Sequence, residues 1–146
     1  VMTKPQEILV DVIGLGSGVV DRLSEQNLPV RGVNVAEAPS TKKNFLNLRA
    51  ELWFAIKDWL AQRDCRLPND DELVAELVAP IYKYTSTGKI KIESKEEMKK
   101  RGIKSPDRAD ALALTMASAA ASFSGSQSFM GYNFKKPLKS RILRVG

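Results

Sequence analysis

One stretch, residues 105–112 (SPDRADAL), constrains the fold of this chain more than any other, because it predicts the start of a long helix with two acids on one face. Ser105 is a favourable N-cap, and Pro106 suits the first helical position, where the missing N–H of proline is no loss. Asp107 and Asp110 are three residues apart, so both carboxylates point to the same side of the helix. The residues that follow are almost all Ala, Leu, Met, Thr or Ser, and we expect this helix to be apolar on every side and buried.

The two acids also have an ordinary explanation, since a carboxylate in the first turn of a helix gains about 0.3–1 kcal/mol from the helix dipole. A third acid, Asp11, stands at the end of an apolar stretch far upstream. Hard divalent cations prefer carboxylate oxygens, and acids contributed by separate elements are typical of their sites. The pattern therefore leads to the hypothesis of a metal site that combines Asp11 with the acids of the helix.

Composition and charge describe one domain followed by a basic tail. The chain has 146 residues, 43% of them hydrophobic, which is enough for one core. The formal net charge is +6, and residues 123–146 contribute five lysines or arginines and no acid, so the rest of the chain is nearly neutral. These residues are rich in Ser, Gly and Phe before the basic segment, which is typical of a flexible end or of a strap that orders on a partner. A polyanionic partner fits this charge, although the same balance occurs in proteins that bind none.

Other residue types exclude several classes of protein. A single cysteine, Cys65, excludes an internal disulfide, and the absence of histidine excludes a Cys/His zinc site. The longest apolar run, residues 109–121, is too short and too polar to span a bilayer, and there is no signal-peptide pattern. We expect a soluble intracellular protein without a membrane partner. The first residue is Val1, so we also expect the chain to be a fragment of a longer protein.

The N-terminal part predicts a β-α-β unit. Residues 7–13 (EILVDVI) predict a buried strand, residues 14–18 a glycine-rich turn, residues 19–25 a helix and residues 30–35 a second strand. Such a unit implies a parallel sheet whose functional edge lies at the carboxyl ends of the strands. Asp11 lies near that edge.

The glycine-rich turn resembles a phosphate-binding loop only in part. A dinucleotide-binding G-x-G-x-x-G motif would need glycine at position 19, which is Val19, and no Lys-Ser or Lys-Thr pair follows the turn as in a Walker A loop. We interpret the glycines as a tight turn that lets the strand and the helix pack closely.

The middle of the chain predicts mostly helices. The patterns predict a helix over residues 44–63 that covers the sheet, a shorter helix over 69–77, a hairpin of strands 81–85 and 89–93, and a charged helical turn with a capping box over 94–101. Lys83, Lys89 and Lys91 share one side of the hairpin, which is either a solvated face or a face that contacts phosphates. Trp53 and Trp59 are interpreted as core or flanking residues and not as platforms for stacked bases.

Four segments together resemble a known family. They are VDVIG-x-G-x-GV-x-D-x-L at residues 10–23, NLRAE at 47–51, ESK at 93–95 and KSPDRADAL at 104–112, and they are similar in order and spacing to the nuclease domain of the large terminase subunit of tailed bacteriophages and prophages. The resemblance implies an α/β, ribonuclease H-like fold, with a mixed central sheet flanked by helices and an added β-hairpin. We expect residues 1–122 to form the nuclease domain and residues 123–146 to form the flexible basic tail.

The resemblance also implies the site residues. Asp11 matches the second catalytic acid of the family and Asp107 matches the acid of its C-terminal helix, with Asp110 as an additional or supporting metal ligand. The first acid of the family lies on a preceding strand, for which this sequence has no counterpart because only six residues precede Glu7. We therefore expect the chain to lack that strand, and the activity of this chain alone is an open question.

The activity implied by the resemblance is that of a metal-dependent endonuclease that cuts concatemeric double-stranded viral DNA during genome packaging, in the cytoplasm of the host cell. Two Mg²⁺ or Mn²⁺ ions about 4 Å apart would activate water and stabilise the leaving oxygen. The implied partners are DNA, an upstream ATPase domain, the small terminase subunit and the portal. The candidate DNA-binding residues are lysines: Lys83, Lys89, Lys91, Lys104, Lys135 and Lys136.

Two alternatives stay open at this point. The chain could be a nucleotide-binding α/β domain that uses the turn from Gly14 to Gly18, which stabilisation by a dinucleotide would indicate. It could also be a non-catalytic module that docks on the portal through its basic tail, which partner binding without a metal response would indicate.

Overall fold

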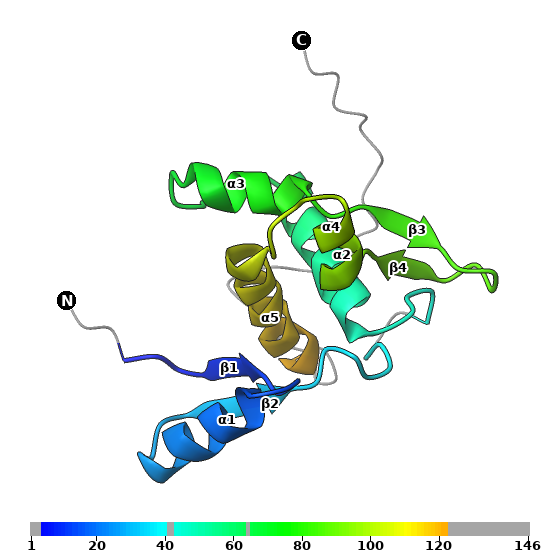
Figure 1. Ribbon diagram of the computed structural model, residues 1–146. Coiled ribbons are helices and arrows are strands. Elements are labelled where there is room, and N and C mark those ends of the chain that lie inside the picture. The colour runs from blue at the N-terminus through cyan, green and yellow to red at the C-terminus, as the bar shows by residue number, and fades with distance from the viewer. Residues whose placement is uncertain (1–3, 41–42, 64, 123–146) are drawn as a thin grey trace.

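The computed structural model describes residues 4–40, 43–63 and 65–122 (Figure 1). The elements follow one another as β1 (Ile8–Asp11), α1 (Gly16–Glu25), β2 (Val30–Val33), α2 (Leu48–Ala61), α3 (Asp71–Val78), β3 (Tyr82–Tyr84), β4 (Ile90–Ile92), α4 (Lys95–Lys100) and α5 (Asp107–Ser122). In Figure 1, α5 lies between the unit formed by β1, α1 and β2 and the remaining helices, and it packs against β1, α2 and α3. The helix predicted to organise the chain is thus central to the fold.

The predicted β-α-β unit is confirmed. Strands β1 and β2 are parallel, with Ile8 beside Val30 and Asp11 beside Val33, so Asp11 ends β1 at the carboxyl edge. Helix α1 begins at Gly16, earlier than predicted. Gly16 packs closely on the end of β1, because a Cβ atom at this position would lie 1.6 Å from the carbonyl oxygen of Asp11. This contact supports the interpretation of a packing turn at Gly16, whereas an added Cβ atom at Gly14 or Gly18 would meet nothing within 4 Å.

Helix α2 begins later than predicted, because residue 44 lies in a turn and Phe45 forms an isolated β-bridge with Ile90. Asn47 is the N-cap, and its side chain accepts a hydrogen bond from the N–H of Ala50 at 3.1 Å. The preceding residues lie beside β4, where the N–H of Leu46 donates to the carbonyl of Ile90 at 2.8 Å. Phe45 is therefore buried before the helix begins, and its predicted place on the helix is wrong because strand pairing competes with the helical pattern there.

The hairpin has the predicted register. Strands β3 and β4 are antiparallel, with Tyr82 opposite Ile92 and Lys83 opposite Lys91, so tyrosines and lysines lie on opposite faces. Strands β1 and β2 form one small parallel sheet and the hairpin forms another. The fold class is therefore mixed α/β, as predicted. In the described residues, the strands form two separate two-stranded sheets.

The core lies mainly between α2 and α5. Leu52 and Ile56 of α2 are buried, and Ala109, Ala113 and Ala117 form a buried stripe on α5 with a spacing of four residues. The small side chains allow α5 to lie close to its neighbours. The expectation that α5 is buried on every side is wrong, because the opposite face of the helix, including Thr115, is exposed to solvent. Ala, Ser and Thr cost little at such positions, so their presence does not require burial.

The start of α5 is capped from another helix. The N–H groups of Arg108 and Ala109 donate to the same carboxylate oxygen of Glu76 in α3, at 2.7 and 2.9 Å. Ser105, the predicted N-cap, instead donates its hydroxyl to the carboxylate of Asp107 at 2.6 Å. A carboxylate satisfies the free N–H groups and complements the helix dipole, so the tertiary contact replaces the local cap.

Within the described ranges, no helix is both long and apolar enough to cross a membrane. The predicted basic tail, with Lys135 and Lys136, lies outside the described residues.

Candidate active site

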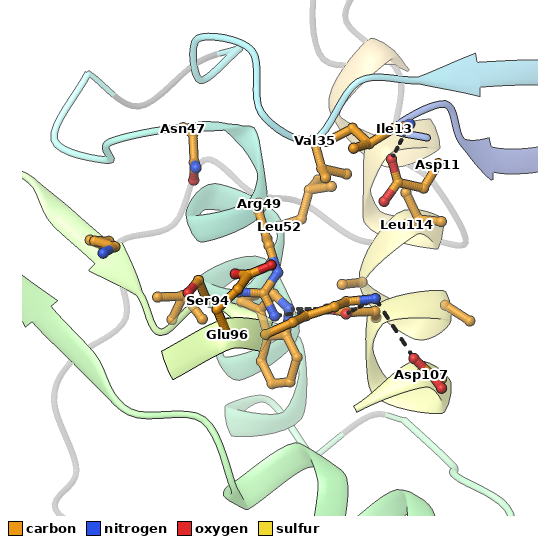
Figure 2. A pocket seen from close by; sticks show the side chains of 17 residues that line it. Asp11, Ile13, Val35, Asn47, Arg49, Leu52, Ser94, Glu96, Asp107 and Leu114 are labelled. Carbon is orange, nitrogen blue, oxygen red and sulfur yellow. Dashed lines mark hydrogen bonds and ion pairs between the residues drawn. The ribbon is translucent and has the colours of Figure 1, made fainter. Parts of the chain in front are cut away.

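A pocket of about 460 Å³ opens beside the first turns of α5 (Figure 2). Its walls come from the end of β1, from α2, from the segment joining β4 to α4, and from α5. Its floor is apolar, with Leu52, Ile92 and Leu114, and its rim carries both acids and bases. All three predicted acids line this pocket: Asp11, Asp107 and Asp110.

Asp107 is the exposed acid of the pair on α5, with 71% of its side chain accessible. The hydrogen bond from the Ser105 hydroxyl, together with the nearby charge of Lys95, holds the pKa of Asp107 below its ordinary value. Asp107 is therefore ionised near neutral pH and open to a ligand from solvent.

Asp110 is the acid of the pair whose side chain is fixed by hydrogen bonds, and 19% of that side chain is accessible. Its Oδ1 atom accepts two hydrogen bonds from α2, one from Arg49 at 3.1 Å and one from the indole N–H of Trp53 at 3.0 Å. Its Oδ2 atom is buried and accepts no hydrogen bond. An unsatisfied buried carboxylate oxygen is unusual in a folded protein and calls for a positively charged partner.

Lys95 supplies a positive charge between the two acids. Its Nζ atom lies 3.4 Å from Oδ2 of Asp110 and 3.7 Å from Oδ1 of Asp107, both within ion-pair range. The contact with Asp110 lacks the geometry of a hydrogen bond, so Oδ2 is paired by charge alone. The two acids thus lie on a common face of α5, as predicted, and both are within ion-pair range of the same ammonium group.

Asp11 lies in another part of the pocket. Its Oδ1 atom accepts the N–H of Ile13 at 3.0 Å, a local turn that fixes the side chain. Figure 2 shows Asp11 apart from Asp107, on the side of the pocket where Leu114 is labelled, and Leu114 is about two helical turns beyond Asp107 on α5. In the part of the chain that the structure describes, no three acids or cysteines gather closely enough to hold a metal ion together. The catalytic and metal-binding roles of Asp11, Asp107 and Asp110 therefore stay predictions.

Residues that were not predicted as site residues also line the pocket. Arg49 and Trp53 are four residues apart on α2 and reach Asp110 together. Trp53 is buried, as predicted, but its indole N–H donates a hydrogen bond to Asp110, which lines the pocket. The NLRAE segment contained Arg49, whereas no local pattern connected either residue with Asp110. Glu96 adds a fourth acid, and a hydrogen bond from its own backbone N–H is the main cause that lowers its pKa.

The candidate DNA-binding lysines differ in their surroundings. Lys91 lines the pocket and pairs with Glu97 at 3.2 Å. Lys104 pairs with Glu72 at 3.5 Å and is highly exposed. Lys83 and Lys89 are exposed on the hairpin. The hairpin thus carries basic side chains from solvent to the edge of the pocket.

No protein-family model and no curated protein matches this chain. Solved structures of the nuclease domain of the large terminase subunit gp2 of bacterial virus Sf6 do match it. A point mutant of that domain with manganese and beta-thujaplicinol has a TM-score of 0.64 and 24% sequence identity, over 77% of this chain and 65% of that chain. The domain without the mutation has a TM-score of 0.58 and 23% identity over the same shares.

The same mutant domain solved with calcium also has a TM-score of 0.58. This chain spans 65% of the length of the gp2 domain, so the likeness concerns the fold of the shared part. The architecture around the pocket, with a carboxylate-bearing helix packed on a parallel β-α-β unit, is therefore similar in fold to the gp2 nuclease domain over the shared part.

Proposed function

We propose that this chain is the metal-dependent endonuclease domain of a viral DNA-packaging terminase large subunit. In this proposal it hydrolyses phosphodiester bonds of concatemeric double-stranded DNA with two Mg²⁺ or Mn²⁺ ions. The single observation that carries the proposal is the pair Asp107 and Asp110 around one cationic group, in a pocket of a fold that is similar to terminase nuclease domains.

The acids of α5 suit a divalent cation. Oδ2 of Asp110 is buried without a hydrogen-bond donor, and Asp107 offers a second, ionised carboxylate on the same side. Carboxylate oxygens are the preferred ligands of Mg²⁺, and Mn²⁺ accepts the same donors. Asp107 and Asp110 would hold one ion, and Asp11 would hold the second from the end of β1. Metal ions bound there would supply activated water and neutralise the charge of the phosphate.

Lys95 would leave its place between the acids when a cation binds, because the two positive charges exclude each other. Its side chain is half exposed and its contacts are long, so this exchange costs little. The released ammonium group would lie close to the pocket, where it can pair with a phosphate oxygen of the substrate.

DNA would approach along the hairpin. Lys83 and Lys89 are exposed and would contact phosphates directly, whereas Lys91 and Lys104 would first exchange their glutamate partners. Contacts of this kind are independent of base sequence and weaken with salt. The proposal includes the DNA substrate, the terminase ATPase domain, the small subunit and the portal as partners, and the host cytoplasm as the location.

The test begins with Mn²⁺ titration by calorimetry. We expect the chain to bind Mn²⁺ and Asp107→Ala to bind it at least about tenfold more weakly, because one of two carboxylate ligands is lost. Glu25→Ala is the matched control, since it removes an exposed acid of α1 that pairs only on the surface. Equal affinities for the chain and for Asp107→Ala would contradict the proposal.

Nicking of supercoiled plasmid DNA then tests the reaction itself. We expect cleavage that requires Mn²⁺ or Mg²⁺ and disappears in Asp107→Ala, with Glu25→Ala as active as the parent chain. Cleavage that survives the loss of Asp107 would remove the assignment of this pocket.

A further inference from the structure

We infer that Arg49 and Trp53 form a clamp that orients Asp110 and leaves its Oδ2 atom as the oxygen available to a cation. Both are positioning residues, since they act through Asp110. This inference rests on the proposed function, because it concerns how the same pocket prepares its metal ligand.

The clamp holds one oxygen of the carboxylate and not the other. Arg49 and Trp53 donate to the same Oδ1 atom, at 3.1 and 3.0 Å. Two donors on one oxygen oppose rotation of the carboxylate, since rotation would break both hydrogen bonds. The buried Oδ2 atom keeps its lone pairs free, and it is the atom that faces the ammonium group of Lys95.

The donors themselves are fixed by burial. Trp53 is 7% exposed, and the side chain of Arg49 is 15% exposed. The guanidinium carbon of Arg49 lies 5.7 Å from the centre of the Trp53 ring, so the two side chains also stack in cation–π fashion. Their spacing of four residues on α2 places them on one side of that helix.

A second contact ties the clamp to the segment that carries Lys95. The other terminal nitrogen of Arg49 donates to the carbonyl oxygen of Glu93 at 2.7 Å. Glu93 is itself buried and holds Arg101 at 2.8 Å and the N–H of Ile81 at 3.2 Å. One guanidinium group therefore fixes Asp110 relative to the end of the hairpin and the start of α4.

The two cations beside Asp110 have different roles as a result. Lys95 is half exposed and pairs at 3.4 Å without a hydrogen bond, so an incoming cation can displace it. Arg49 is largely buried, with hydrogen bonds on both sides, so it stays in place. Lysine could not replace it, because a single ammonium group lacks the planar fork that reaches Asp110 and Glu93 together.

Partners that orient a metal ligand are worth about 10–100-fold in metal affinity. We therefore expect Trp53→Phe, which keeps an aromatic ring but loses the N–H, to weaken Mn²⁺ binding about tenfold in calorimetry. Arg49→Lys should weaken it by a similar or larger factor. Trp59→Phe is the matched control on the same helix and should bind Mn²⁺ like the parent chain.

A double-mutant cycle separates positioning from general loss of stability. In an Asp110→Ala background, Trp53→Phe should cause no further loss of Mn²⁺ affinity, because the oriented carboxylate is already absent. A full further loss in that background would overturn the clamp.

A readout without metal comes from the indole N–H resonances, since the chain has only two tryptophans. In ¹⁵N–¹H spectra, Asp110→Ala should shift the Trp53 indole resonance and speed its hydrogen exchange, with the Trp59 resonance unchanged. An unmoved Trp53 resonance would overturn the clamp whatever the metal data show.

The outcomes distinguish the two proposals. If the parent chain binds Mn²⁺ and Trp53→Phe binds it equally well, the clamp is overturned and the proposed function stands. If the parent chain binds no Mn²⁺, the proposed function is overturned. The inference that the clamp prepares Asp110 for a cation is then overturned as well.

Discussion

At the scale of single residues, the two acids of α5 differ in their surroundings, and the proposed cation site depends on this difference. Asp110 is oriented by buried donors, whereas Asp107 is exposed and ionised. A site built from one fixed and one accessible carboxylate can select the position of a cation and still admit it from solvent. The neighbouring backbone is equally specific, because Gly16 packs directly on Asp11.

A pair of glycines in α1 tests that packing. Gly16→Ala should destabilise the protein by about 1–3 kcal/mol, because the added methyl group meets the carbonyl oxygen of Asp11 and forces the backbone apart. Gly18→Ala in the same helix should stabilise it by about 0.5–1 kcal/mol, since nothing lies within 4 Å of the new Cβ atom and alanine favours the helix. Urea denaturation measures both free energies of unfolding, and effects of the same sign would contradict the close packing.

At the scale of elements, the two helices that carry Lys95 and Asp107 begin at caps that include a glutamate carboxylate. Helix α4 has a complete capping box, in which Ser94 and Glu97 satisfy each other's backbone N–H groups at 3.2 and 2.8 Å. Helix α5 takes its cap from Glu76 of α3. The capping box depends on the ionised carboxylate of Glu97, so the start of the helix that carries Lys95 is sensitive to acid.

The capping box predicts how stability depends on pH. The hydrogen bond from the Ser94 N–H, followed by the contact with Lys91, lowers the pKa of Glu97 from 4.5 to about 2. Because the pKa is lower in the folded state, the contribution of Glu97 to stability is complete above about pH 4.5 and is lost as the pH falls towards about 2. The free energy of unfolding should therefore differ between the parent chain and Glu97→Gln at pH 7 and converge near pH 2, as measured by denaturation at several pH values. A difference that does not change with pH would contradict this account.

At the scale of the whole molecule, the described residues pack with uneven density. Nearly all buried hydrophobic residues belong to α2, α5 and the segments beside them, and Val33 is the buried hydrophobic residue of the β1, α1 and β2 unit. Helix α1 has no buried residue, and Leu15 and Val19 at its start are exposed. The strand that carries Asp11 therefore belongs to the less densely packed part of the described fold.

Hydrogen exchange should reveal this difference. We expect the backbone amides of α1 to open with a lower free energy than those of Leu52 and Ile56 in α2, because few apolar contacts are lost when α1 opens. Exchange followed by NMR at neutral pH gives both values, and equal opening free energies would show that the two parts unfold as one. If Asp11 takes part in the proposed site, addition of Mn²⁺ should reduce the difference between the opening free energies of α1 and α2, since ligand binding stabilises the bound state.

Local rules account for most of the correct predictions from the sequence. The capping box of α4 and the hairpin depend on residues that are close in the chain, and the parallel unit follows from the order of two apolar segments around a helix. The common face of Asp107 and Asp110 follows from helical spacing alone. The resemblance in four segments led to the fold class, which the solved structures support.

The sequence by itself determined the order and approximate positions of the helices and strands and which acids share a face, because propensity and periodicity act over a few residues. Only the tertiary structure decided that Glu76 caps α5 and that Arg49 and Trp53 hold Asp110, since these partners are 32 to 61 residues apart in the chain. It also decided that Asp11 reaches the same pocket as Asp107 but lies apart from it there. Such contacts depend on how the helices pack against each other, and a pattern of neighbouring residues cannot encode that packing.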